Sequence, residues 1–152
     1  MYQDARAVFN FLQSKMIPSK SIILFGESLG SGAAIQLASE QPVGAILLLA
    51  PYTSLIALGY HHFPFLPVKL LLIDQFNSLE KISTIKTPIL FMLAQYDIVV
   101  PMQFGKQLFE AANEPKKLII YPVGHNDLHH IVAHDILNFI KNEKICKTSD
   151  SD

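Results

Sequence analysis

Apolar residues recur every three or four positions in several segments of the chain, as on one face of an α-helix. These segments predict helices over residues 4–16, 31–40, 102–112 and 127–141, and Pro18 follows the first of them. Their apolar stripes consist of Ala5, Phe9, Leu12 and Met16, then Ala34, Leu37 and Ala38, then Phe104, Leu108 and Ala111, and finally Leu128, Ile131, Ile136, Phe139 and Ile140.

Short and continuously apolar runs lie between these helices, as expected for strands that are buried on both faces of a sheet. The runs are Ser21–Phe25, Val43–Leu49, Pro88–Leu93 and Lys117–Tyr121. Strands that alternate with helices predict an α/β protein with about four parallel strands and helices on both faces. The pattern over residues 53–77 is less regular and includes a short apolar piece, Val68–Ile73. We expect one domain over residues 1–142, followed by a polar, disordered tail over residues 143–152.

Composition excludes several classes of protein. The chain has 152 residues, of which 50% are hydrophobic and 16% are charged, and its net charge is −1. Such a balance argues against nucleic-acid binding and against intrinsic disorder. The only cysteine, Cys146, cannot form an internal disulfide, and we expect a cytoplasmic protein. The apolar excess indicates that the chain either encloses its core fully or lacks a part that covers it.

No membrane-spanning segment is predicted. The stretch Gln41–Val68 contains no charged residue, but its longest clean apolar run, Ala45–Ala50, is far shorter than the ~20 residues of a spanning helix. Prolines interrupt the rest of it at Pro42, Pro51, Pro64 and Pro67. The first residues of the chain also lack the basic and apolar regions of a secretory signal.

Parallel sheets bind ligands at the carboxyl ends of their strands, and the first predicted strand ends in a G-x-S-x-G pattern, Gly26-Glu27-Ser28-Leu29-Gly30. A strand before and a helix after this pattern predict a nucleophile elbow, a strained turn that projects the hydroxyl of Ser28. Side chains at positions 26 and 30 are expected to collide with the adjoining strand or helix. The backbone N–H of Leu29, at the helix N-terminus, is a candidate oxyanion donor.

Other readings of the glycine-rich turn are weaker. A plain β–α turn needs no chemistry at all. A Walker loop requires a lysine that is missing here, and a dinucleotide fingerprint requires a spacing that Gly26, Gly30 and Gly32 do not have.

Asp97 and His125 follow the third and fourth predicted strands. Asp97 is suited to orient a histidine, and His125 to act as the general base for Ser28. The alternatives are a turn or capping role for Asp97 and a surface-loop role for His125. Asp74 and Asp127 are alternative acids, but neither follows a predicted strand.

The order Ser28, Asp97, His125, each just after a strand, resembles that of α/β-hydrolase-fold serine hydrolases. The resemblance extends from Tyr2 to about Lys141 and is strongest to the serine-aminopeptidase-like branch, which includes membrane-associated acyl-protein thioesterase relatives. It is carried by Gly26–Gly32, Pro51–Ser54, His62–Pro67, Tyr96–Pro101, Phe109–Lys117 and Gly124–Asp127.

This resemblance implies triad roles for Ser28, Asp97 and His125 and hydrolysis of a small acyl substrate, an ester, thioester or short acyl-amide, without a cofactor. Gln95 stands where such proteins usually have glycine. The family has about eight strands, with one oxyanion donor in a loop after the third. The resemblance therefore implies that the N-terminal strands and this loop are absent.

The nucleophile strand, Ser21–Phe25, would then be an exposed apolar edge, open to homodimerisation or to pairing with a separate N-terminal half. The alternative function is a non-catalytic fragment of a truncated or split hydrolase.

Several further residues allow two readings. Tyr52, His62, Phe63 and Phe65 could line an acyl pocket or form a packed connecting segment. Glu27 could shape the oxyanion region or simply be fixed by the turn. The histidines at 125, 129, 130 and 134 include pairs with zinc-ligand spacing, but no H-E-x-x-H occurs and no third ligand is clear, so no metal is predicted. The lysines at 141, 144 and 147 are expected to be a solvated end.

Overall fold

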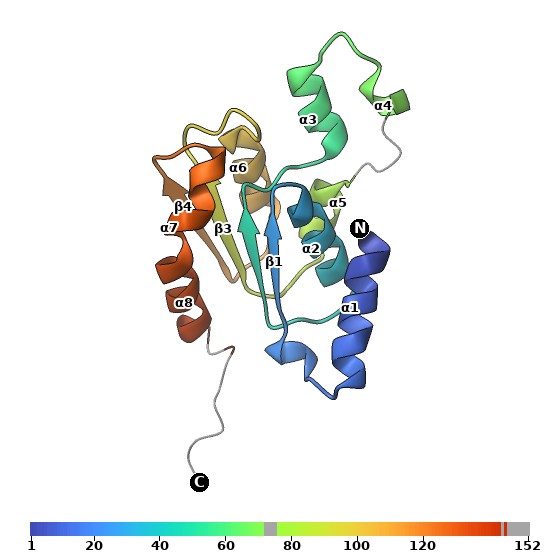
Figure 1. The fold of residues 1–152 in the computed structure, drawn as a ribbon, viewed down its shortest axis with the longest axis vertical. Coiled ribbons are helices and arrows are strands. Elements are labelled where there is room, and N and C mark those ends of the chain that lie inside the picture. Colours follow the sequence, from blue (N-terminus) through green and yellow to red (C-terminus); the bar gives the residue numbers. More distant parts are fainter. Residues whose placement is uncertain (72–75, 144, 146–152) are drawn as a thin grey trace.

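A four-stranded, fully parallel sheet forms the centre of the molecule, with its strands in chain order, β1-β2-β3-β4 (Figure 1). The computed structural model describes residues 1–71, 76–143 and 145. The strands are β1 (Ile23–Glu27), β2 (Ala45–Leu49), β3 (Ile89–Ala94) and β4 (Lys116–Tyr121). The predicted α/β class and the parallel sheet are confirmed. Most of the predicted tail, and the alternative acid Asp74, lie outside the described residues.

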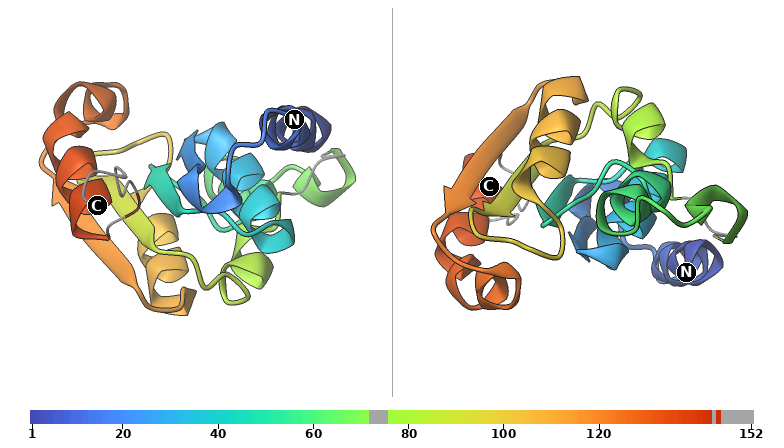
Figure 2. Two further views of the ribbon diagram at one scale, coloured as in Figure 1. Left: turned by 90° about the horizontal axis from the view of Figure 1, so that it is seen from below. Right: turned by 90° about the horizontal axis from the view of Figure 1, so that it is seen from above.

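Helices connect the strands in sequence order. They are α1 (Tyr2–Ser14), α2 (Leu29–Glu40), α3 (Leu55–His62), α4 (Val68–Leu71), α5 (Ser78–Ile82), α6 (Met102–Ala111), α7 (Leu128–Ile131) and α8 (Ala133–Asn142), with short 3-10 turns η1 (Ser19–Ser21) and η2 (His125–Asp127). The helices α1, α2, α5 and α6 lie on one face of the sheet, and α8 lies on the other (Figure 2). No helix in the described ranges is both long and apolar enough to cross a membrane.

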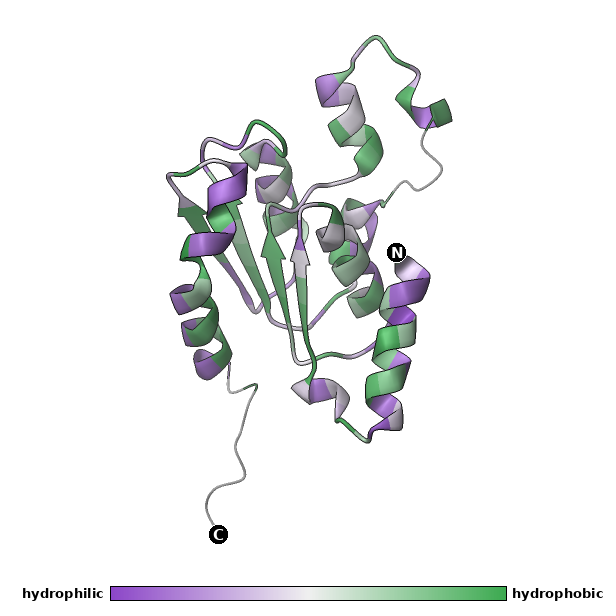
Figure 3. Ribbon diagram, in the orientation of Figure 1, coloured by the Kyte–Doolittle hydropathy of each residue, from purple (hydrophilic) through white to green (hydrophobic). Residues whose placement is uncertain are grey.

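The core lies against both faces of the two central strands. Every residue of β2 and β3 is buried, and these strands are hydrophobic along their whole length (Figure 3). One cluster joins Ile46, Leu48 and Phe91 to α1, α2, α5 and α6. A second cluster joins Leu47 and Met92 to α8. Because all four strands are parallel, their carboxyl ends lie at the same end of the sheet.

The two outer strands are less buried than their apolar sequences predicted. Among the described residues β1 pairs only with β2, so its other edge is open to them, and Phe25 is 52% exposed. The prediction of a strand buried on both faces is therefore wrong for β1, whereas the prediction of an exposed apolar edge is confirmed.

Three helical predictions need correction. Met16 lies beyond the end of α1 and is 89% exposed, so it does not extend the apolar stripe. The predicted helix 127–141 is divided at Val132 into α7 and α8, and this break leaves Ile131 exposed. The segment predicted to be irregular contains α3, whose first turn is capped by the hydroxyl of Ser54, which accepts the N–H of Ala57 at 3.0 Å.

Candidate active site

Ser28 lies between the end of β1 and the start of α2 in a left-handed conformation, with φ 47° and ψ −117°. Such angles are strained for a residue other than glycine and persist only where neighbouring contacts hold them. The N–H of Ser28 donates to the carbonyl of Leu49 at 2.8 Å. The carbonyl of Ser28 accepts two hydrogen bonds from Ser31, one from its N–H at 3.0 Å and one from the Ser31 hydroxyl at 2.6 Å. These bonds fix the turn on both sides, as a nucleophile elbow requires.

The amide of Leu29 is the first N–H group of α2 and so has no acceptor within the helix. The helix dipole places partial positive charge at the same point. The amide can therefore donate to an anion that forms next to Ser28.

Gly26 and Gly30 differ in their surroundings. A Cβ at Gly26 would lie 2.7 Å from the Cα of Ser31 and 2.9 Å from the Cβ of Ala34, because β1 and α2 approach closely there. A Cβ at Gly30 would meet no atom of the described residues within 4 Å. The expected collision is confirmed at Gly26, and it is wrong at Gly30 because that position opens onto a surface groove.

We expect Gly26→Val to destabilise the fold by about 3 kcal/mol, because the contact with Ser31 is to backbone that cannot move independently. Gly30→Ala is the matched control and is expected to raise stability by up to about 1 kcal/mol, since alanine favours the helix. Urea unfolding monitored by circular dichroism gives both values. Equal effects of the two substitutions would contradict this view of the turn.

Asp97 follows β3, and its carboxylate is almost fully enclosed, with 1% of the side chain exposed. One oxygen, Oδ1, accepts the N–H groups of Val99 at 2.8 Å and Val100 at 2.7 Å. The other oxygen, Oδ2, lies 2.6 Å from Nδ1 of His125. The turn that follows β3 therefore fixes the orientation of the carboxylate and points one oxygen at the histidine.

His125 begins η2, directly after the loop that leaves β4, and its side chain is 14% exposed. Backbone bonds tie this loop to the one that carries Asp97: the N–H of Gln95 donates to Tyr121 at 2.8 Å, and that of Tyr96 donates to Val123 at 3.0 Å. The Gln95 position, where the family usually has glycine, thus takes part in ordinary strand pairing.

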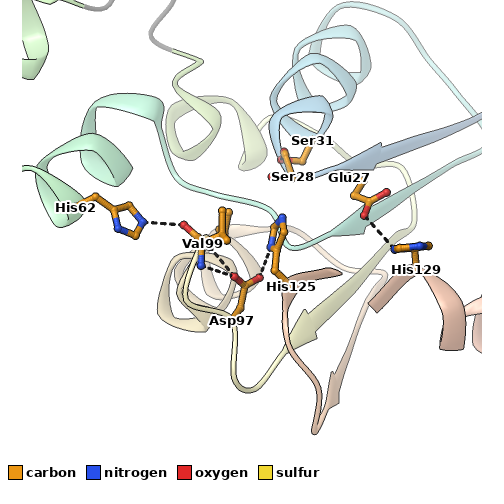
Figure 4. A network of polar contacts seen from close by, with 9 residues as sticks. Glu27, Ser28, Ser31, His62, Asp97, Val99, His125 and His129 are labelled. Atoms are coloured by element: carbon orange, nitrogen blue, oxygen red, sulfur yellow. Dashed lines mark hydrogen bonds and ion pairs between the residues drawn. The ribbon is translucent and has the colours of Figure 1, made fainter. Parts of the chain in front are cut away.

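The ring of His125 lies between Asp97 and Ser28, with its second nitrogen directed towards Ser28 (Figure 4). In the neutral imidazole, an Nδ1–H that donates to Asp97 leaves Nε2 without a proton, so Nε2 can accept one. Ser28 and His125 both lie within the described ranges, and no hydrogen bond joins them in this structure. The structure brings Ser28, Asp97 and His125 together at the carboxyl end of the sheet.

The other acids near this edge have different roles. Asp127 lies in η2 and is exposed. The hydroxyl of Tyr121 donates to Asp135 at 2.6 Å, and burial together with this carboxylate raises the pKa of the Tyr121 hydroxyl. Neither carboxylate contacts His125 in the described part of the chain.

Tyr52 is 1% exposed and lies beneath α2, where its hydroxyl donates to the carbonyl of Leu29 at 3.2 Å. Burial raises the pKa of the Tyr52 hydroxyl. The residue supports the first turn of the helix after Ser28, and it does not belong to the lining of the cavity between α3 and α4.

An apolar cavity of about 350 Å³ lies between α3 and α4. It is lined by Leu55, Leu58, Gly59, His62, Phe63, Leu66, Val68 and Leu71. His62 and Phe63 line this cavity, whereas Phe65 is 98% exposed and lies outside it.

His62 also makes a contact that the sequence did not predict. Its Nε2 donates to the carbonyl of Val99 at 2.8 Å, and the N–H of Val99 donates to Oδ1 of Asp97 (Figure 4). One wall of the cavity is therefore joined to the turn that holds the carboxylate.

His129 lies near Glu27, whose Oε1 is 3.9 Å from Nδ1 of that histidine. The rings of His129 and His130 lie 3.8 Å apart. Among the described residues, no group of three or more His, Cys, Asp or Glu side chains is arranged to hold a metal ion.

Comparison with protein-family models gave no match. An uncharacterized protein from Mycobacterium tuberculosis is 42% identical over 141 residues, covering 91% of this chain and 50% of that protein. Human alpha/beta hydrolase domain-containing protein 17B is 30% identical, covering 84% of this chain and 44% of the relative. The Caenorhabditis elegans alpha/beta hydrolase domain-containing protein aho-3 is also 30% identical, covering 94% and 43%.

Solved structures give the same fold. The esterase domain of a Rhodothermus marinus protein has a TM-score of 0.74 at 21% identity, covering 93% of this chain and 68% of that domain. An acetyl xylan esterase from Paenibacillus sp. R4 has a TM-score of 0.77 at 18% identity, covering 93% and 51%. The chain therefore has part of an α/β-hydrolase fold. It spans about half the length of the curated relatives that it matches.

Proposed function

We propose that this chain carries the catalytic residues of a serine hydrolase that acts on esters, thioesters or short acyl-amides. The observation that carries the proposal is the 2.6 Å contact between His125 and the enclosed carboxylate of Asp97, at the edge of the sheet where the strained Ser28 turn lies. The relatives named alpha/beta hydrolases and the esterases of similar fold support the same reaction class.

In the proposed reaction, Nε2 of His125 accepts the proton of the Ser28 hydroxyl while Oγ attacks the acyl carbon. Asp97 keeps the other ring proton on Nδ1 and stabilises the imidazolium that forms. The N–H of Leu29 donates to the oxyanion. His125 then protonates the leaving group, and water releases the acyl group from Ser28 in a second step of the same kind.

A second candidate is a domain that is inactive as this chain alone and that needs the residues by which its relatives are longer. The chain covers 50% of its 42% identical relative, and the free edge of β1 lies directly before Ser28. Loss of one oxyanion donor costs about 10²–10³ in kcat. Turnover of p-nitrophenyl acetate by the purified chain separates the candidates, since only the first gives rates typical of esterases.

The test of the proposed nucleophile is covalent labelling with a fluorophosphonate probe, which reacts with serines activated by a neighbouring base. We expect one adduct per chain, mapped by peptide mass spectrometry to Ser28. Protein unfolded in urea is the control and should not react, because the activation depends on His125. No adduct on folded protein, or an adduct on another serine, would refute the assignment of Ser28.

A further inference from the structure

We propose that His62, the last residue of α3, is a positioning residue for Asp97 and, through Asp97, for His125. This role rests on the proposed function, in which Asp97 orients His125 as the general base. His62 lies outside the triad and reaches the loop after β3 from a helix on the other side of that loop, 37 positions earlier in the chain.

The contact between His62 and this loop is a hydrogen bond to a backbone carbonyl. Nε2 of His62 lies 2.8 Å from the carbonyl oxygen of Val99. A carbonyl oxygen can only accept, so Nε2 carries a proton and donates it to this bond. Nε2 keeps that proton both in this neutral form of the ring and in the charged form, so the bond does not depend on the charge of His62.

The carbonyl of Val99 belongs to the same peptide group as the N–H of Val100. This N–H donates to Oδ1 of Asp97 at 2.7 Å. A peptide group is planar, so its carbonyl and its N–H cannot turn independently of each other. His62 therefore holds one end of the planar group whose other end binds the carboxylate.

Three hydrogen bonds thus form a continuous path from α3 to His125 (Figure 4). The first joins His62 to the peptide group, and the second joins that group to Oδ1 of Asp97. The third joins Oδ2 of Asp97 to Nδ1 of His125 at 2.6 Å. A carbonyl that accepts a hydrogen bond polarises its peptide group and strengthens the bond that the N–H donates. Loss of the first bond should therefore weaken the second and leave the carboxylate less firmly oriented.

The loop has little other support at this point. Ile98 is 84% exposed and Val99 is 46% exposed. Among the described residues, the only hydrogen bond between residues 98–100 and another element is the one from His62. The side chain of Val100 is buried, so removal of His62 should loosen the peptide group without unfolding the loop.

Neighbouring rings hold His62 in place. The rings of His61 and His62 meet edge to face with their centroids 5.1 Å apart, and His61 meets Phe104 of α6 in the same way at 5.7 Å. α6 begins directly after the loop that carries Asp97. The last turn of α3 is therefore packed against the helix that ends the loop, which keeps Nε2 of His62 within bonding distance of Val99.

Two substitutions at position 62 separate the hydrogen bond from the packing of the ring. His62→Gln keeps an N–H donor at a similar reach but removes the ring, whereas His62→Phe keeps a ring and removes the donor. We expect kcat for p-nitrophenyl acetate to fall about tenfold in His62→Phe and by less than about threefold in His62→Gln, with KM changed by less than about twofold in both. The acetyl group is too short to fill the cavity that His62 also lines, so binding in that cavity does not enter the comparison.

Nuclear magnetic resonance gives a readout that needs no turnover. The N–H of Val100 belongs to the peptide group that His62 contacts, whereas the N–H of Val99 donates to the same carboxylate oxygen, at 2.8 Å, from the preceding peptide group. In His62→Phe the amide proton of Val100 should shift upfield, and that of Val99 should move less. The proton on Nδ1 of His125, identified by its loss in Asp97→Asn, should also shift upfield. His62→Gln should leave all three resonances near their original positions.

The role of His62 and the proposed function fail in different ways. An unchanged kcat in His62→Phe, equal losses in His62→Phe and His62→Gln, or a Val100 amide that moves no more than that of Val99 would each overturn the role of His62. If the purified chain shows no turnover, the resonances alone decide. Absence of the Nδ1 proton resonance from the unmodified protein would contradict the contact between His125 and Asp97, and with it both the proposed function and the path from His62.

Discussion

Ser28→Ala is expected to lower kcat for p-nitrophenyl ester hydrolysis by about 10⁶-fold, to the rate that binding alone supports. Removal of the nucleophile prevents formation of the acyl-enzyme, and the remaining residues His125 and Asp97 cannot replace it. The fold should not change, because the backbone of residue 28, and not its hydroxyl, makes the bonds that hold the turn.

Ser39→Ala is the matched control for this substitution. Ser39 lies on the same helix, α2, and its hydroxyl donates only to the carbonyl of Gln36 at 2.7 Å. Initial rates with equal concentrations of folded protein should be unchanged in this variant. A Ser28→Ala protein that retains more than a hundredth of the rate would show that the measured hydrolysis has another source.

Asp97→Asn is expected to lower kcat by about 10⁴-fold through the wrong histidine tautomer. The amides of Val99 and Val100 require an acceptor at the Oδ1 position, so the oxygen of the new asparagine stays there. Its NH₂ group then faces Nδ1 of His125, which must accept and carry no proton. The ring proton moves to Nε2, which can no longer accept a proton from Ser28.

The measurement for Asp97→Asn combines steady-state kinetics with a thermal unfolding scan. The loss of kcat should come with little change in Tm, because the two amide contacts remain. Asp127→Asn changes an exposed carboxylate in the next loop and should keep the original rate. If both variants lose activity equally, Asp97 has no special part in orienting the base.

Much of the fold was predictable because it follows from local patterns. The apolar runs of β2 and β3 are continuous, and both strands are fully buried. In a parallel sheet the residues that follow each strand lie at the same end of the sheet. Ser28, Asp97 and His125 could therefore be grouped from their positions in the sequence alone. The closeness of Asp97 and His125 follows from this topology together with the bonds between their two loops.

Other features depend on contacts that no local pattern contains. α3 carries apolar residues around most of its circumference, so it has no clear stripe, and only the Ser54 cap marks its start. The bond from His62 to Val99 joins residues 37 positions apart. Gly30 is open because no described residue packs against it, whereas Gly26 is crowded by α2. The G-x-S-x-G pattern alone does not tell a crowded glycine from an open one.

The chain-order arrangement of the strands has a consequence for biosynthesis. Because the order is β1-β2-β3-β4, a growing chain can add each strand beside the one made before it, without inserting a late strand between two earlier ones. Ser28 can therefore reach its strained turn before β3 and β4 are made, once β2 supplies the carbonyl of Leu49. His125 leaves the ribosome only after β4, so the serine does not meet its proposed base until all four described strands have been made.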